Sequence, residues 1–428
     1  MAVFSKRKTW TFSLIVFLVS TAFLIFPIKA ETTQIYFGAY VGPSHKDTLV
    51  QLQAFETTAN KEVGIWHWIQ YWNRPKDQEN SPYFETAWMD ECRAHGSIPM
   101  ITWDPEGGWN DSYINLNSII QGNMDNYLRT WAQNAKAWGH PFFVRLFHEF
   151  NGEWTSWCEG VNGNTQGQFV QAWRHVVNVV RSAGETDITW VWSPNIQDEK
   201  GLNLTSLYPG DSYVDWTGMD GYNWGDTTSF SQVFSWTYNK ILSIAPTKPM
   251  MIAEVGCKES NYKATFFSDM LNTQLPNNFG KIKAIVYWEG QVGGRGSTNA
   301  LLIESNADAL SAFKQGIASN YYSSNAFSSL SISPIPVSDS EPTKTSVPTE
   351  IQASPTLNPN QGNSQNLSFL LTPEFLVLAT LIVLVSAIAI VSIVLRRKSR
   401  FGQTRRKGRM LQASSYAERT LGGGSRAS

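Results

Sequence analysis

Two apolar runs of the chain each lead into a glutamate, and hydrolysis of an acetal needs two such carboxyl groups. The run from Pro141 to Phe147 leads into His148 and Glu149, and the run that starts at Lys248 leads into Glu254, 105 residues after Glu149. Hydrolysis of a glycosidic acetal needs one carboxyl group to protonate the leaving oxygen and a second to stabilise or trap the sugar cation. The two glutamates are therefore candidates for the acid and the nucleophile of a glycosidase.

The neighbours of Glu149 favour it as the acid. His148 precedes it and Trp154 follows in an aromatic stretch, an environment suited to a carboxyl group with a raised pKa. Tryptophans beside a carboxylate are also typical of a sugar site. Glu153 and Glu289 are rival candidates that we rank lower.

The expected partners of Glu254 come from a third strand end, Met219–Asp220–Gly221–Tyr222. We expect Asp220 and Tyr222 to hydrogen-bond and orient Glu254. The alternative is a purely structural carboxylate paired with a lysine such as Lys258.

The elements that would position these residues alternate between strand and helix. Helical spacing of apolar residues marks Phe169–Ala183 and Leu301–Ile317. Eight nearly continuous apolar runs predict parallel strands covered on both faces, which indicates an α/β fold, a (β/α)8 TIM barrel. A doubly wound open sheet is the alternative, but no glycine-rich phosphate loop follows the first strand. The expected strands are Ile35–Val41, Val63–Tyr71, Ile98–Trp103, Phe142–Phe147, Ile188–Ser193, Trp216–Met219, Met250–Ala253 and Ala284–Trp288.

Almost every expected strand ends in polar or aromatic residues. In a barrel of this type the C-terminal strand ends converge on one site, so these residues are expected to meet there. The predicted lining of the site, besides the two glutamates, is His67, Trp103, His148, Asn151, Trp154, Asp220, Tyr222 and Trp288.

The string RLFHEFNGEW, from Arg145 to Trp154, resembles the acid/base motif of glycoside hydrolase family 26, in which Arg, His-Glu, Asn-Gly and Trp recur at this spacing. The resemblance extends through residues 188–195, 208–225 and 248–257 and covers about residues 35–318. The family comprises retaining endo-acting enzymes of a TIM-barrel clan, clan A, including β-mannanases, mixed-linkage β-glucanases and β-1,3-xylanases.

The resemblance implies a role for each matching residue. Glu149 would be the acid/base and Glu254 the nucleophile of a double displacement that retains anomeric configuration. The resemblance further implies supporting positions at His148, Trp154, Asp220 and Tyr222, and a clan tryptophan at Trp288.

The expected function is that of a membrane-anchored endo-β-glycanase that hydrolyses a β-1,4-linked polysaccharide, mannan or mixed-linkage β-glucan. The motif requires no metal or organic cofactor, and the cysteine and histidine spacing offers no metal site. A cell-surface carbohydrate-binding protein on an inactive hydrolase barrel is the alternative, and the oligomeric state stays open.

Charge is distributed unevenly along the 428 residues, although the net charge is only −1. Residues 31–395 carry 20 basic and 34 acidic groups, whereas residues 396–428 carry ten basic and one acidic. The acidic middle part has nothing to neutralise phosphates, which argues against nucleic acid as a partner.

The two ends carry membrane signals. Residues 1–30 read as a secretory signal peptide, with an uncleaved anchor as the alternative. Residues 31–321 form the expected barrel domain, and 322–372 a disordered linker rich in Ser, Thr and Pro. Residues 375–395 contain no charge and predict one transmembrane helix. The basic residues of 396–428 then place this tail in the cytoplasm and the barrel domain outside the cell membrane.

Three cysteines, Cys92, Cys158 and Cys257, are an odd number for an exported protein. A bridge between Cys158 and Cys257 is conceivable because each follows an expected catalytic strand end. Isolated buried thiols are the alternative, and we favour them slightly.

Overall fold

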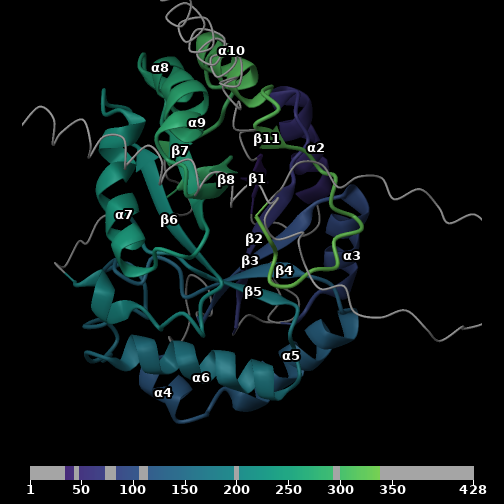
Figure 1. The fold of residues 1–428 in the computed structure, drawn as a ribbon, viewed down its shortest axis with the longest axis vertical. Helices are drawn as coiled ribbons and strands as arrows, with labels where there is room; N and C mark the ends of the chain where they lie inside the picture. Colours follow the sequence, from purple (N-terminus) through teal and green to yellow (C-terminus); the bar gives the residue numbers. More distant parts are fainter. Residues whose placement is uncertain are drawn as a thin grey trace, which may run out of the picture. The chain divides into compact units, whose positions relative to one another are not determined.

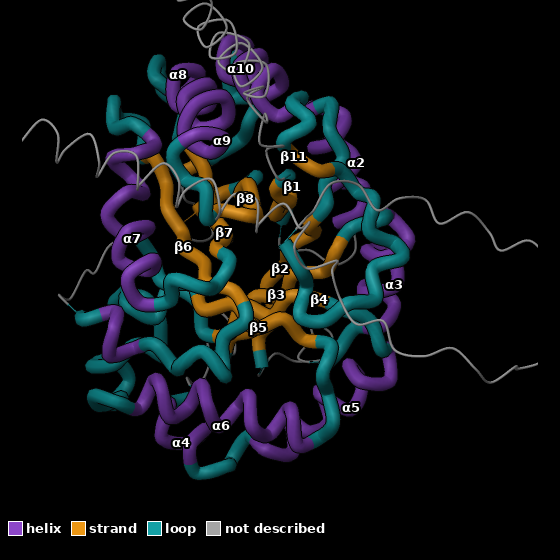
Figure 2. The backbone as a smooth tube through the Cα atoms, in the orientation of Figure 1, coloured by secondary structure: helices purple, strands orange, loops and turns teal. Residues whose placement is uncertain are grey.

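A computed structural model of the chain describes residues 34–42, 48–72, 83–105, 114–196, 202–292 and 299–337. All of them belong to the first of two compact units, residues 1–345. Eight parallel strands follow each other in chain order, and β8 pairs back to β1, so the sheet is a closed barrel (Figures 1 and 2). The strands are β1 (Ile35–Tyr40), β2 (Ile65–Tyr71), β3 (Ile98–Asp104), β4 (Phe142–Leu146), β5 (Ile188–Trp192), β6 (Trp216–Asn223), β7 (Met250–Cys257) and β8 (Ile282–Trp288).

The predicted (β/α)8 barrel is thereby confirmed, and the open doubly wound sheet is wrong. All eight expected strands are present, and β6 and β7 each continue four residues beyond the expected end. The reason is that their polar C-terminal residues keep pairing with one another, for example Tyr222 with Gly256. Polarity at these positions marks the site rather than the end of the strand.

Helices surround the barrel, as Figure 2 shows for α5, α6 and α7. The expected helix from Phe169 is confirmed as α6, whereas α10 begins six residues later than Leu301 because Asn306 caps it by accepting from the Ala309 amide. The helical segments are α2 (Thr48–Ala59), α3 (Thr86–His95), α4 (Leu116–Ile120), α5 (Asp125–Trp138), α6 (Gln168–Ser182), η1 (Leu204–Leu207), α7 (Phe230–Ile244), α8 (Lys263–Ser268), η2 (Asp269–Gln274), α9 (Leu275–Asn277) and α10 (Ala307–Ile317). Three two-residue strands complete the fold, β9 (Gln291–Val292), β10 (Asn299–Ala300) and β11 (Tyr322–Ser323).

Alternation along each strand separates side chains inside the barrel from those facing the helices. On β3, Ile101 and Trp103 join the outer apolar cluster under the helices, while Met100 joins the inner one. Thr102 and Asp104 share the inward parity of Met100. Every second residue near a strand end is therefore available to the mouth of the barrel.

A β-bulge in β7 changes this alternation beside the candidate nucleophile. Met219 of β6 pairs with Ile252 and Asp220 with Glu254, which leaves Ala253 without a partner on β6. Ala253 belongs to the inner apolar cluster, and the next residue, Glu254, also turns inward onto a guanidinium group of β4. Bulges re-aim side chains in this way, and without it the glutamate would face the helices.

Residues 322–337 close the end of the barrel where the strands begin, which we call its lower end. β11 pairs with β1, and Ile335 is buried in the inner cluster with 1% of its surface exposed. The Trp216 indole donates to the Ile335 carbonyl at 2.8 Å, and the Ile335 amide donates to Thr189 Oγ1 at 2.8 Å. The prediction of a disordered linker is therefore wrong for residues 322–337. The few apolar residues of this segment are enough because Phe327, Leu330 and Val337 pack against the same inner cluster that Ile335 joins.

The remaining predictions for the chain ends concern residues outside those described: the signal peptide at 1–30, the linker at 338–372, the transmembrane helix at 375–395 and the tail at 396–428. Among the described residues, no helix combines the length and apolarity that a membrane crossing requires. All three cysteines lie in the described part as buried free thiols. A bridge between Cys158 and Cys257 is therefore not formed.

Candidate active site

Glu254 is held from two sides at the mouth of the barrel. Arg145 Nη2 donates to its Oε1, and the Tyr222 hydroxyl donates to its Oε2. Only 4% of Glu254 is exposed. The expected hydrogen bond between Tyr222 and Glu254 is present, and the charged partner of Glu254 is Arg145 rather than Lys258. Burial, followed by the charges of Glu254 and Glu149, raises the pKa of Tyr222, so its hydroxyl stays a proton donor.

Arg145 connects the residues beneath Glu254 and was not among the predicted site residues. Its side chain is fully buried, and Nη1 donates to Asp220 Oδ1 at 2.7 Å while Nε donates to Thr102 Oγ1 at 2.8 Å. Asp220 thus acts on Glu254 through this shared guanidinium. Burial and the charge of Glu254 raise the pKa of Asp220 against the opposing effect of Arg145. A signal existed in the sequence, since Arg145 has the inward parity on β4 and opens the motif.

Glu149 lies in the loop after β4, where the backbone takes an uncommon conformation. Phe147 and Glu149 have φ of 48° and 49°, in the left-handed region that non-glycine residues rarely adopt. Glu149 Oε1 accepts from Asn195 Nδ2 at 2.8 Å, and Oε2 accepts from Trp154 Nε1 at 2.5 Å. The Glu149 amide donates to the Ser193 carbonyl at 3.0 Å, which fixes the turn. Both carboxyl oxygens therefore have a donor, and Asn195 is a second site residue absent from the predicted set.

The surroundings of Glu149 and Glu254 carry different charges, as an acid and a nucleophile require. Burial, and then the negative charge of Glu254, raises the pKa of Glu149. Its neighbour His148 lies 3.1 Å from Asp104 Oδ1 through Nδ1. Burial lowers the pKa of His148, but the Asp104 carboxylate outweighs it and raises that pKa to about 9. A protonated imidazole therefore stands beside Glu149 at neutral pH.

An aromatic wall closes the other side of the mouth. Trp288 stacks on Tyr40 with ring centroids 3.8 Å apart, and the His67 ring lies 5.4 Å from that of Tyr40. His67 is fully buried and contacts Thr102 Oγ1 at 2.7 Å through Nε2. Burial, and then the charge of Arg145, lowers the pKa of His67, so the imidazole is neutral. Trp288 lies at the mouth as predicted, and His67 forms part of the floor beneath it.

The structure does not bring every predicted residue to the mouth. Trp103 points outward, is fully buried and stacks on Trp131 of α5 at 4.1 Å, because odd positions of β3 face the helices. Asn151 is fully buried behind Glu149 and bonds to the backbone of Asn195.

Neither rival acid shares the position of Glu149. Glu153 is exposed. Glu289 accepts from the Ile303 amide at 3.0 Å in the loop before α10, and burial together with Glu304 raises its pKa to about 9. The raised pKa of Glu289 therefore comes from its burial and its contacts with the loop before α10.

Two tryptophans remain exposed beside the glutamates. Trp154, which donates to Glu149, is 54% exposed, and Trp224 is 49% exposed with its ring 5.2 Å from that of Tyr222. Large exposed aromatic faces next to buried carboxylates suit the apolar faces of sugar rings. Trp224 lies within residues 208–225, to which the family resemblance extends, but it was not among the predicted site residues.

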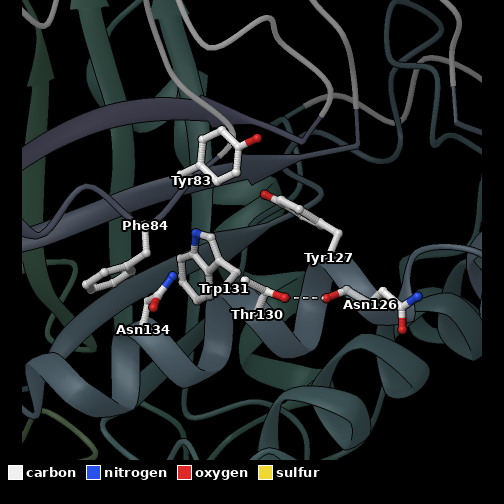
Figure 3. Close-up of a pocket in the computed structure, with 7 residues that line it drawn as sticks. All are labelled: Tyr83, Phe84, Asn126, Tyr127, Thr130, Trp131 and Asn134. Atoms are coloured by element: carbon white, nitrogen blue, oxygen red, sulfur yellow. Dashed lines mark hydrogen bonds between the residues drawn. The ribbon is translucent and has the colours of Figure 1, made fainter.

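A separate groove lies on the outside of the barrel. Figure 3 shows that it runs along α5 and that the chain before α3 forms its other side. None of the predicted site residues lines it. Its lining consists of Tyr83, Phe84, Asn126, Tyr127, Thr130, Trp131 and Asn134. Within the described residues, no group of three or more His, Cys, Asp and Glu side chains is placed to hold a metal ion.

A closed parallel barrel with two buried glutamates at the C-terminal ends of β4 and β7 defines the class of barrel glycoside hydrolases. Residues 59–286 match the family model described as glycosyl hydrolase family 26. The chain therefore belongs to glycosyl hydrolase family 26, as the motif around Glu149 predicted.

Known proteins resemble the chain over the same region. Endoglucanase H of Acetivibrio thermocellus is 32% identical over 291 residues, which is 65% of this chain and 30% of that protein. A mannan endo-1,4-beta-mannosidase of Bacillus subtilis is 27% identical over 244 residues, 53% of this chain and 62% of that protein. The chain thus spans less than two thirds of the length of either relative. Among solved structures, the catalytic domain of an endo-beta-1,4-mannanase from Bacillus sp. JAMB-750 has the same fold, with a TM-score of 0.53 and 20% identity over 70% of this chain and 91% of that domain.

Proposed function

We propose that the protein is a retaining endo-β-glycanase that cleaves a β-1,4-linked polysaccharide, with Glu149 as acid/base and Glu254 as nucleophile. The observation that carries this proposal is the contrast between the two glutamates. Burial and the charge of Glu254 raise the pKa of Glu149, whereas Glu254 contacts the guanidinium of Arg145. One carboxyl group is thereby suited to hold a proton and the other to carry a charge.

The proposed reaction has two steps. Glu254 attacks the anomeric carbon while Glu149 protonates the departing oxygen, which gives a glycosyl-enzyme intermediate and releases one part of the polymer. Water then attacks the same carbon, Glu149 takes its proton, and Glu254 leaves as a carboxylate. The Tyr222 hydroxyl and Arg145 keep the departing carboxylate in position through the contacts they already make.

Mannan and mixed-linkage β-glucan are the proposed substrates. The names of the relatives, an endoglucanase and a mannan endo-1,4-beta-mannosidase, support this substrate class. The exposed faces of Trp154 and Trp224 add room for sugar units beyond the cleavage point, which an endo-acting enzyme needs.

The first test compares the full chain with its Glu254→Ala variant on mannan, glucomannan, mixed-linkage β-glucan and β-1,3-xylan, by counting new reducing ends. We expect the parent to cleave one of the first three polymers, and the variant to lose nearly all turnover with unchanged circular dichroism. Equal activity of the two proteins would remove Glu254 from the mechanism. Binding without cleavage by the parent would instead support a carbohydrate-binding protein on an inactive barrel.

We also propose that the protein is anchored in the cell membrane by residues 375–395, with the barrel outside and residues 396–428 in the cytoplasm. The 21 uncharged residues, followed directly by a basic cluster, support this orientation. Intact cells treated with protease should lose the barrel domain and retain the tail. A chain truncated after residue 372 should leave the membrane fraction.

A further inference from the structure

Asn151 ties the loop that carries the candidate acid to the loop after β5. Its Oδ1 accepts from the Asn195 amide at 2.9 Å, and its Nδ2 donates to the Asn195 carbonyl at 3.0 Å. Asn151 is fully buried and Asn195 is half-buried, so this pair of hydrogen bonds is partly shielded from water. The Asn151 side chain thereby restrains both backbone polar groups of Asn195, its N–H and its C=O.

The side chain of Asn195, whose backbone is restrained in this way, contacts Glu149. Its Nδ2 donates to Glu149 Oε1 at 2.8 Å. On its other side Asn195 forms a parallel bridge with Asp220, next to the hydrogen bond from the Ile196 amide to the Asp220 carbonyl at 2.9 Å. The position of the donor, Asn195 Nδ2, is thus set by Asn151 on one side and by Asp220 on the other.

We propose that Asn151 is a positioning residue that acts through Asn195 to align the Glu149 carboxyl group with the oxygen it protonates. This inference rests on the proposed role of Glu149. It differs from the direct substrate contact that the sequence suggested for Asn151, since the buried amide bonds to the backbone of Asn195.

The proposal has a consequence for the titration of Glu149. A donor to the ionised carboxylate favours that form, so the hydrogen bond from Asn195 lowers the pKa of Glu149 against burial and the charge of Glu254. Loss of that donor should therefore raise this pKa further. The titratable groups that act on Glu149 or are acted on by it are His148 from its own loop, Asp220 and Tyr222 from β6, and Glu254 from β7.

The chain offers a matched control in Asn164. It lies in the same loop, is 3% exposed, and also bonds to the backbone, donating to the Ser156 carbonyl at 2.8 Å and accepting from the Leu116 amide at 2.8 Å. None of the bonds described for Asn164 reaches Glu149 or Asn195. Substitution of either asparagine should therefore loosen the loop in general. Only substitution of Asn151 should change the pKa of Glu149.

The experiment measures kcat/KM against pH for the full chain and for Asn151→Ala, Asn195→Ala, the double variant and Asn164→Ala, on aryl glycosides with good and poor leaving groups. We expect both Asn151→Ala and Asn195→Ala to move the alkaline limb upward by about one pH unit. We expect roughly tenfold loss on poor leaving groups and a smaller loss on good ones. The double variant should lose little more activity than Asn195→Ala, because both substitutions act on the same contact, the hydrogen bond from Asn195 to Glu149.

A pH profile of Asn151→Ala that matches Asn164→Ala, or full additivity in the double variant, would overturn the proposal. If alanine prevents folding, Asn151→Ser is the second variant, with the same upward shift expected. A parent that cleaves no glycoside would count against the proposed function only. In that case ¹³C-carboxyl titration of Glu149, assigned with Glu149→Gln, decides the inference: a higher pKa in Asn151→Ala but not in Asn164→Ala supports it, and equal pKa values in the two variants refute it.

Discussion

At the scale of single residues, the site depends on small differences around two glutamates. Glu149 sits in a left-handed backbone conformation that costs on the order of 1–2 kcal/mol, which the surrounding hydrogen bonds offset. Glu254 lies on a regular strand displaced by one bulged residue. Strain and irregularity thus occur at the two positions where the proposed chemistry takes place.

The first residue-scale prediction concerns proton transfer by Glu149. Because its pKa is raised above the ordinary 4.5, the acid stays protonated to higher pH, and kcat/KM should fall only as the pH rises through that raised value. Glu149→Ala should lose roughly 10²–10⁴-fold on polysaccharide and much less on substrates with good leaving groups. It should also lack the alkaline limb on those substrates. Equal losses on all substrates would argue against Glu149 as the acid.

The second residue-scale prediction concerns Gly152. A Cβ atom placed there would lie 2.4 Å from two ring atoms of Trp154, so alanine must push the indole away from Glu149. Gly152→Ala should therefore lower kcat on poor leaving groups roughly tenfold, as expected for one lost donor to the acid. Gly163→Ala in the same loop, with nothing within 4 Å of its Cβ, controls for loop substitution although its φ of +76° adds backbone strain. Unchanged kcat in Gly152→Ala would show that the indole contact is dispensable.

At the scale of elements, contacts between neighbouring strand ends hold the mouth together. Arg145 of β4 reaches Asp220 of β6 and Glu254 of β7, and His148 after β4 reaches Asp104 of β3. Each contact joins segments that are distant in the chain. The pairing of charges therefore stabilises the arrangement of the strand ends as well as the site.

The pair of His148 and Asp104 leads to a prediction on stability and pH. The pKa of His148 rises from 6.5 to about 9 on folding, a shift equivalent to roughly 3 kcal/mol. This stabilisation is complete below pH 6.5 and is lost as the pH rises through about 9. The difference in the free energy of unfolding between the parent and Asp104→Asn, measured with urea, should accordingly be largest near pH 6 and shrink toward pH 10. A difference independent of pH would contradict the pairing.

At the scale of the described unit, the chain closes its own barrel from below. The segment after β11 packs Ile335 into the inner apolar cluster, and Tyr36 donates to the Pro336 carbonyl at 2.9 Å. The end of the barrel opposite the site is therefore sealed by residues that follow α10. A barrel domain that ends at residue 321 would lack this closure.

Ile335 and Ile332 provide a matched test of the closure. Ile335 is 1% exposed and Ile332 is 60% exposed, on the same segment. Ile335→Ala should lower the free energy of unfolding by about 2–5 kcal/mol, and Ile332→Ala should change it by less than about 0.5 kcal/mol. Both variants of the full chain should keep the parent kcat at temperatures where they are folded. Equal stability of the two variants would show that the segment does not seal the barrel.

The sequence by itself determined the strands and the two glutamates. Nearly continuous apolar runs of four to nine residues indicate burial on both faces, and polar residues at their ends indicate the mouth of a barrel. The HEFNG string then led to family 26, which the family match confirmed. These features are local in the chain, so one sequence is enough to read them.

The tertiary structure alone decided which neighbours serve the site. Trp103 and Thr102 are adjacent, and only the parity of β3 sends the hydroxyl inward and the indole outward. The contact of Asn195 with Glu149 joins residues 46 positions apart, and the seat of Ile335 requires a hole formed by several strands. Strand parity, bulges and contacts between distant segments are set when the barrel closes, because closure is what gives each side chain its surroundings.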